Sequence, residues 1–290
     1  MHFGRAASRE HIVQSALSQQ LQRLERELRV RLLERSTHHV QLTPAGDAFL
    51  AEVRQILAHV DRAAVTAQRA ATSTPVLRVG TADASYDSMP QILHRIRQQY
   101  PDLEIHEIEA GVPEQFRMLL DGRLDVGLGR ASLAPPEVAA ELFRLDPLGV
   151  LVAEGHQLAG WSTVPVATLA AEPLLLAKER RAPEFNQFVT ELCNSVGFMP
   201  TVYRGTVDSI RAAADLVLQG RCVVCAPASC VSRLTGIVWR PLIQPVSSYP
   251  WSVLWRAGGG SEHVRAVVTT AGRLSRELGW LDPSSQVVAG

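Results

Sequence analysis

The chain has 290 residues and no net charge, because 29 Lys and Arg balance 29 Asp and Glu. This length is enough to bury large cores, and we expect more than one domain. The chain has no long apolar stretch typical of a membrane-spanning helix and no signal-peptide pattern, so we expect a cytoplasmic protein with reduced cysteines. A neutral total does not by itself suggest a nucleic-acid partner. The charge is unevenly distributed, however: residues 1–75 carry ten Arg against seven acidic residues.

Residues 14–28 have the pattern of an amphipathic helix. Four leucines with spacings of four, three and four fall on one side of it: Leu17, Leu21, Leu24 and Leu28. The opposite side presents hydroxyl, amide and guanidinium groups: Ser15, Ser18, Gln19, Gln22 and Arg26, with Arg23 on the flank. Such a face can contact base edges and phosphates, although an ordinary surface helix has the same pattern.

The neighbouring segments favour DNA binding. A short helical piece over residues 3–10 and a break at 11–13 precede the helix, and two alternating runs, 31–35 and 40–42, follow it around a polar tip. These runs predict a β-hairpin. Helix, turn, helix and β wing in this order form a winged helix-turn-helix.

The motifs of this region are similar to those of the LysR-type transcriptional regulators: AAS-x5-QSALSQQLQRLE, then L-x-VRLLERS, then LTPAGDAFL. The resemblance implies a DNA-binding domain over residues 1–45. It implies base contacts by Gln14, Ser15, Ser18 and Gln19, with Gln22 also facing DNA. It assigns phosphate contacts to Arg23, Arg35, Thr37 and His39.

Three features depart from the family pattern. The chain starts at Met1, and we expect the family's first helix to be missing. Val13 replaces the usual Ser or Thr cap, and Arg29 replaces the usual Gly after the helix. These departures leave an alternative open: a ligand-sensing dimer with a DNA-binding-deficient head.

A long linker helix over residues 46–74 is expected next. Thr43 and Pro44 supply a cap and a first-turn proline. Apolar residues at alternating spacings of three and four then form a coiled-coil seam, which predicts dimerisation through Leu50, Val53, Leu57, Val60 and Ala64. The alternative is a helix packed on its own domain.

The second half alternates strands with helices, which predicts a parallel, doubly wound α/β sheet. We expect strands at 76–80, 103–108, 124–128, 174–177, 202–204 and 222–226, and helices at 88–100, 113–120, 184–196 and 209–218. LLDGRLDVGLG and VLQGRCVVCAP echo each other, which predicts two similar lobes. Residues 251–255 and 262–278 are expected to return to the first lobe. The pattern resembles the family's two-lobed, periplasmic-binding-protein-like effector domain over 75–290, with lobe I at about 76–160 and 248–280 and lobe II at about 161–247.

Ligands of such folds bind between the lobes, beyond the carboxyl ends of the strands, which nominates residues 81–85, 111–112, 130, 178–185, 205–206 and 226–227. The resemblance places an effector at Asp83, Ala84, Ser85, Val112, Arg130, Phe185 and Thr206. LDVGLGR, PEFNQF and APAS look most like the branch that senses aromatic-degradation metabolites, which implies an aromatic or other organic acid. Ala84 and Val112 replace hydroxyls that the family uses for carboxylates, Asp83 would repel a dicarboxylate, and Arg130 fits a structural ion pair as well as an anion site.

No catalytic or nucleotide-binding motif occurs, so we expect no enzyme, no cofactor and no metal site. Cys222-x-x-Cys225 lies in an expected strand, where residues three apart point to opposite faces, although a Cys225–Cys230 redox pair remains an alternative. The expected partners are operator DNA with an inverted repeat, a small-molecule effector, further copies of the chain in a dimer or tetramer, and RNA polymerase. A solute-binding transport protein is a rival that the amino-terminal motifs oppose.

Overall fold

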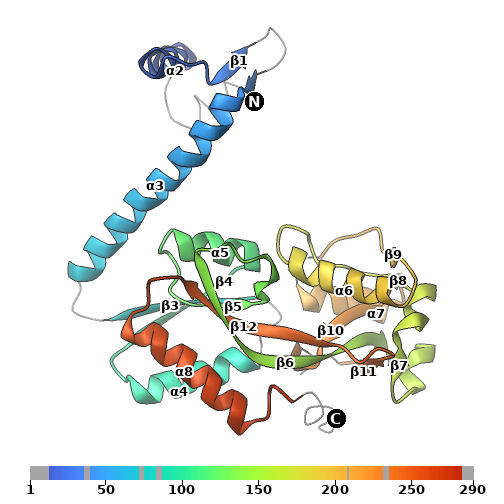
Figure 1. Cartoon of the computed structure of the whole chain (residues 1–290). Helices are drawn as coiled ribbons and strands as arrows, with labels where there is room; N and C mark the ends of the chain where they lie inside the picture. The colour runs from blue at the N-terminus through green and yellow to red at the C-terminus, as the bar shows by residue number, and fades with distance from the viewer. Residues whose placement is uncertain are drawn as a thin grey trace. The chain divides into compact units, whose positions relative to one another are not determined.

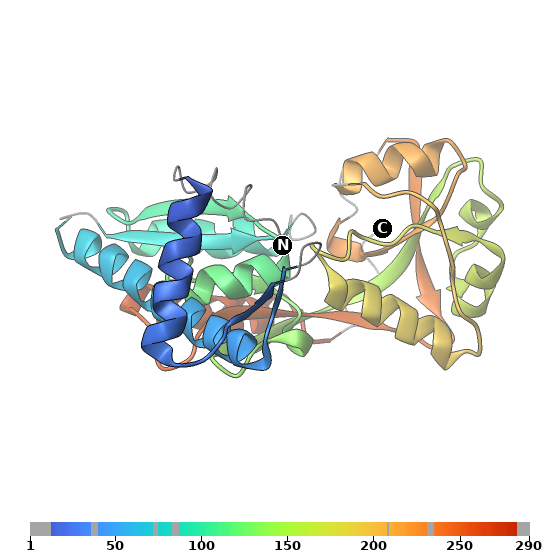
Figure 2. The same ribbon diagram turned by 90° about the horizontal axis from the view of Figure 1, so that it is seen from above.

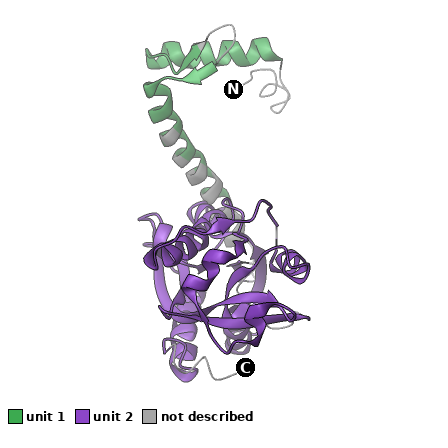
Figure 3. Cartoon of the chain, turned by 90° about the vertical axis from the view of Figure 1, so that its right-hand side faces the viewer, with its two compact units in different colours: residues 1–64 green, residues 65–290 purple. Residues whose placement is uncertain are grey.

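A computed structural model of the chain describes residues 13–35, 40–71, 75–82, 87–207, 209–230 and 235–282 (Figure 1). The chain divides into two compact units, residues 1–64 and 65–290, which Figure 3 shows in different colours. The long helix α3 (Pro44–Ala71) carries the boundary between them.

The first unit contains the predicted helix and hairpin. Helix α2 spans Gln14–Leu28, and strands β1 (Leu33–Arg35) and β2 (Val40–Leu42) pair antiparallel. The Glu25 carboxylate accepts hydrogen bonds from the backbone N–H groups of Leu32 at 2.8 Å and Leu33 at 3.1 Å. One side chain of the helix therefore holds the start of the wing.

The ends of these helices follow the sequence signals. Thr43 caps α3, since its Oγ1 accepts the N–H of Gly46 at 2.9 Å and donates to the carbonyl of Arg31 at 2.6 Å. Val13 stands before α2 without a side-chain cap, and Arg29 ends α2 with a left-handed φ of 57°. A non-glycine residue in this conformation is uncommon, and it marks a strained end of the helix.

The second unit consists of two lobes joined by two long strands (Figure 2). Lobe I contains β3 (Val76–Thr81), α4 (Ser88–Gln99), β4 (Glu104–Glu109), α5 (Val112–Leu120), β5 (Gly127–Gly129) and α8 (Glu262–Glu277). β3 pairs in parallel with β4, and a bridge between Val79 and Val126 places the next strand on its other side. Apolar side chains of α4 and α8 pack with this sheet in one core.

Lobe II repeats the same order. It contains β7 (Val164–Pro165), β8 (Pro173–Leu174), α6 (Pro183–Ser195), β9 (Thr201–Val202), α7 (Ile210–Leu218), β10 (Val224–Pro227) and β11 (Ile237–Ile243). β8 pairs in parallel with β9, and Leu174 bridges Val223. Gly122 after α5 and Gly220 after α7 both have positive φ, 71° and 65°. The predicted internal repeat is thus present and includes the turns after the helices. Each turn has glycine where the backbone adopts a left-handed conformation, which other residues rarely adopt.

The two joining strands were not predicted in full. β6 (Val138–Ala153) and β12 (Ser248–Arg256) pair antiparallel, and β10 and β11 pair antiparallel with the second half of β6. The predicted parallel pairings are present in each lobe, and the sheet is mixed because β6 and β12 add antiparallel pairings that the sequence did not predict. The passage between the lobes lies within β6, because Leu148, Val150 and Val152 pack in the core of lobe II.

Candidate effector-binding and DNA-binding sites

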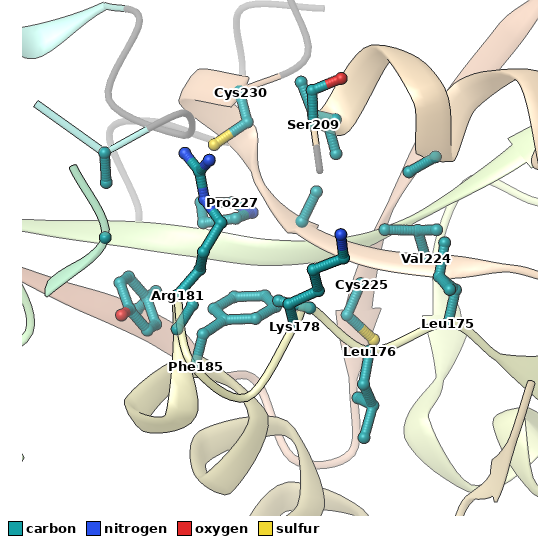
Figure 4. A pocket seen from close by; sticks show the side chains of 18 of the residues that line it. Leu175, Leu176, Lys178, Arg181, Phe185, Ser209, Val224, Cys225, Pro227 and Cys230 are labelled. Atoms are coloured by element: carbon teal, nitrogen blue, oxygen red, sulfur yellow. The ribbon is translucent and has the colours of Figure 1, made fainter. Parts of the chain in front are cut away.

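The second unit holds a cavity of about 150 Å³ between its lobes (Figure 4). Most of its lining comes from lobe II: the segment after β8, the start of α6, one side of α7, and β10. Lobe I contributes Ala82, Gly111 and Val112, and the joining strand β12 contributes Tyr249 and Trp251. The lining is mainly apolar, and its charged members are Lys178, Arg181 and Glu184.

The lobes contact each other at the edge of this cavity. The backbone N–H of Val112, at the start of α5, donates to the carbonyl of Arg181 at 3.1 Å. A side chain on Gly111 would not fit, since its Cβ would lie 2.3 Å from the same carbonyl oxygen. The Arg181 guanidinium donates to Glu109 of β4 at 2.7 Å. A main-chain hydrogen bond and an ion pair thus join α5 and β4 of lobe I to the loop before α6 of lobe II.

An aromatic cluster lies beside the cavity. The rings of Phe185 and Phe188 each meet Tyr249 edge to face, with centroids 5.3 Å apart. The Arg130 guanidinium lies over Phe188, 4.9 Å from the ring centroid, and donates to the main-chain oxygen of Glu184 at 3.0 Å. Arg130 is therefore a structural link between β5 and α6.

Glu184 is a buried carboxyl in the lining of the cavity. It is only 2% exposed, and among the described residues its Oε2 atom has no hydrogen-bond partner. Burial raises the pKa of this carboxyl from 4.5 to about 7, against the opposing effects of its own backbone N–H and of Arg130. Near neutral pH its charged and neutral forms therefore have comparable populations.

A buried polar network leads from the cavity to α4. The indole N–H of Trp251 donates to Asp146 Oδ2 at 3.2 Å, and the Ser229 backbone N–H donates to Oδ1 at 3.2 Å. Burial raises the pKa of Asp146, and nearby Arg144 opposes this shift. Arg144 in turn donates to Ser88 at 2.9 Å, at the start of α4. A displacement of the Trp251 side chain would therefore disturb the hydrogen bond to Asp146 and, through Arg144, the contact with the start of α4.

The cysteines are buried thiols in lobe II. Cys222 and Cys225 pack in different cores, as expected for opposite faces of a strand. Burial raises the pKa of Cys225 well above its ordinary value. Cys225 is therefore a protonated, unreactive thiol at neutral pH. In the described parts of the chain, no cluster of His, Cys, Asp and Glu could hold a metal ion.

The effector residues expected from the family are only partly brought together. Val112 and Phe185 line the cavity. Arg130 is not part of the lining, and its guanidinium stacks on the Phe188 ring. Thr206 is exposed and outside the lining, to which Val207 and Ser209 contribute instead. Asp83, Ala84 and Ser85 lie outside the described residues. The expected Ala226 and Pro227 at the end of β10 line the cavity, whereas sequence reasoning missed the walls formed by α7, β12 and the start of β10, including Ile210, Ala213, Val224, Cys225, Cys230, Tyr249 and Trp251.

The residues expected to contact DNA lie mostly at the surface of α2. Gln14, Ser15, Gln19, Gln22 and Arg23 are exposed, and Ser18 is half-buried. The Arg23 side chain pairs with Glu27 at 2.9 Å, a contact that solvent screens. Arg35 ends β1, but its side chain lies outside the described parts, as do Thr37 and His39.

Helix α3 carries apolar residues at its surface. Leu57 is 58% exposed and Val60 is 60% exposed within the single chain, and Ala64 is also exposed. Leu50 and Val53 are half-buried. Large aliphatic groups at this spacing on a helix are typical of a surface that a second helix covers.

Comparisons with known proteins agree with this architecture. Residues 70–275 match the LysR substrate binding domain, and residues 1–47 match the bacterial regulatory helix-turn-helix protein family of lysR type. The regulator BenM of Acinetobacter baylyi is 30% identical over 97% of this chain and 93% of its own. The solved structure of the BenM effector-binding domain with its effector benzoate is also similar, with 27% identity and a TM-score of 0.65. The match covers 73% of this chain and 97% of the BenM domain. The chain also matches full-length CbnR complexed with target DNA, with 94% of each chain covered, 27% identity and a TM-score of 0.61.

The chain belongs to the LysR family of DNA-binding transcriptional regulators, with a helix-turn-helix head and an effector-binding domain. The match over residues 1–47 does not favour the alternative of a DNA-binding-deficient sensor. BenM and CbnR are both transcriptional regulators. Over the part of the chain that the structure describes, no helix is long and apolar enough to span a membrane.

The buried carboxyl predicts a pH-dependent stability. Between about pH 4.5 and 7 the unfolded chain loses the Glu184 proton while the folded chain keeps it, so this group lowers the stability as pH rises through that window. The E184Q variant lacks this effect. The melting temperature of E184Q relative to that of the wild type should therefore rise between pH 5 and pH 8. The corresponding change in relative free energy of unfolding is roughly 1–3 kcal/mol.

Thermal unfolding of both proteins across this pH range measures the difference. E191Q, at an exposed position of the same helix, is the matched control. A difference between E184Q and wild type that stays constant from pH 5 to 8 would contradict the assignment.

Proposed function

We propose that this chain is a one-component regulator that binds an inverted-repeat operator as a homodimer or homotetramer and senses an aromatic or other organic acid. The observation that carries the effector proposal is the cavity between the lobes, about 150 Å³ and mainly apolar, with Lys178 and Arg181 in its lining. A cavity of about this size accommodates one aromatic ring. The two cations suit an acid group on that ring.

The solved BenM domain with benzoate supports this choice of ligand class. The departures of Ala84 and Val112 from the family pattern point away from a dicarboxylate. The backbone N–H of Val112 is also used by the Arg181 carbonyl. A single acid group held by side-chain cations therefore fits this cavity better than two acid groups held at helix ends.

DNA recognition is assigned to α2 and the wing. Gln14, Ser15, Ser18 and Gln19 would contact bases in the major groove, with Gln22 beside them, and Arg23, Arg35, Thr37 and His39 would contact phosphates. The exposure of the described members on one helix supports this assignment. Arg23 can exchange its exposed Glu27 partner for a phosphate at little cost.

Assembly is assigned to α3, where Leu50, Val53, Leu57, Val60 and Ala64 would form a seam with a second copy. Effector binding would then change the arrangement of the paired heads on DNA, and with it the DNA bend and the contact with RNA polymerase. Such a switch requires that the effector bind the two arrangements with different affinities. In this proposal the protein acts in the cytoplasm, without catalysis or cofactor.

A blocked cavity should abolish effector binding. Ala213 of α7 is 4% exposed and lines the cavity, so A213F would fill the space that a ligand ring needs. We expect isothermal titration with benzoate to show at least a tenfold loss of affinity relative to wild type, or about 1.4 kcal/mol. A171F adds the same ring at an exposed site of lobe II and should leave the affinity unchanged. Equal benzoate binding by A213F and wild type would move the effector site elsewhere.

Loss of the Gln14 amide should reduce sequence discrimination. A side-chain amide reads a base by paired hydrogen bonds, so Q14A should lower the preference for the operator over an operator with the contacted base pair changed, by about 1–3 kcal/mol. Fluorescence anisotropy with the intergenic DNA beside the gene measures both affinities. Q20A removes an exposed amide of the same helix outside the predicted DNA face and serves as control. Discrimination that is unchanged in Q14A would remove Gln14 from the base-reading set.

Charges in the α3 seam should prevent assembly. L57E/V60E would place carboxylates of two copies against each other in an apolar contact and should weaken association by roughly 3 kcal/mol or more. Sedimentation velocity should show smaller species for this variant than for A63E, which adds a charge to an exposed position of α3 outside the seam. An unchanged distribution of species would place the dimer contact elsewhere.

A further inference from the structure

Glu184 lines the cavity, and one of its carboxyl oxygens, a hydrogen-bond acceptor in the ionised form, has no partner among the described residues. The residue is 2% exposed, and the oxygen without a partner is Oε2. A buried polar atom without a partner is unfavourable, so native structures retain such atoms chiefly where something else pairs with them. A molecule bound in the cavity can supply the missing donor.

The neighbouring donors are used by other acceptors. Arg130 donates to the main-chain oxygen of Glu184 at 3.0 Å, and its guanidinium lies over the Phe188 ring. Asn186 donates to the Ala177 carbonyl at 2.8 Å and to the Glu179 carboxylate at 2.9 Å. Arg181 donates to Glu109. These hydrogen bonds support the backbone and the contact between the lobes, and none of them reaches Glu184 Oε2.

The lining also has opposite charges. Lys178 and Arg181 are cationic, whereas Glu184 is acidic. An unsubstituted aromatic acid would use the cations but would place a C–H edge against Glu184. An aromatic acid with a hydroxyl or amino substituent would satisfy both kinds of group. The volume of about 150 Å³ accommodates one ring with small substituents.

We infer, on the basis of the proposed effector site, that the effector is a single-ring organic acid that also carries a hydrogen-bond donor, a hydroxyl or an amino group, and that this donor pairs with Glu184 Oε2. Glu184 then determines selectivity between substituted and unsubstituted acids. A site built around a buried hydrogen-bonding group discriminates strongly against an analogue that lacks the partner group, because the buried atom is then left unpaired.

The test compares matched ligands on matched variants of the full chain. Isothermal titration measures the affinities of benzoate and of its hydroxy and amino isomers for wild type, E184Q, E184M and E191M. E184M keeps the length of the side chain but removes both oxygens, and E184Q keeps one acceptor oxygen. E191M makes the same exchange as E184M at an exposed position of α6.

For wild type and E191M, at least one donor-bearing isomer should bind roughly ten times more tightly than benzoate, or better. In E184M this ratio should fall to about one while benzoate itself still binds, which also shows that the cavity is intact. E184Q should lie between the two. A donor preference that persists in E184M would overturn the inference, as would a wild type that binds benzoate as tightly as every substituted isomer. If wild type binds none of these acids, the aromatic-acid proposal fails as well.

Discussion

The antiparallel pairing of β6 with β12 is the constraint on which the second unit depends. β6 runs from one lobe into the other, since Phe143 packs in the core of lobe I and Leu148, Val150 and Val152 pack in the core of lobe II. β12 holds the first half of this strand in lobe I. β6 pairs with β12 over its first half and with β10 and β11 over its second half. Because Tyr249 and Trp251 lie on β12, the wall of the cavity is part of the connection between the lobes.

This arrangement explains why polar groups are buried near the cavity. Asp146 lies on β6 at 0% exposure, where it accepts bonds from Ser229 of lobe II and Trp251 of β12. Arg144 extends the network to α4. A buried network of this kind favours one arrangement of its members over others, since a partly satisfied network costs free energy. An occupant of the cavity that moves Trp251 therefore acts on the lobe connection, and a regulator requires such a link between ligand and conformation.

The local parts of the fold could be predicted from the sequence, and the non-local parts could not. Leucine spacing predicted α2, the Thr43 cap predicted the start of α3, and Gly122 and Gly220 marked the internal repeat. β6 escaped prediction because Pro147 and Gly149 resemble strand breakers and because its second half is buried on both faces, which removes the alternation of apolar and polar residues. Likewise, the composition of the cavity depends on pairing across about a hundred residues, and the burial of Glu184 leaves no mark in the sequence.

Recognition of a specific DNA sequence is the property that defines this chain as a regulator, and selection from a random duplex library tests it most directly. The 290-residue protein is incubated with the library at several salt concentrations, and the bound DNA is amplified and sequenced through successive rounds. We expect enrichment of an inverted repeat whose half-sites are spaced for paired heads, with retention that weakens as salt rises. Retention without enrichment of any sequence at any salt concentration would contradict this expectation, and the protein would then be a sensor without a functional DNA-reading head.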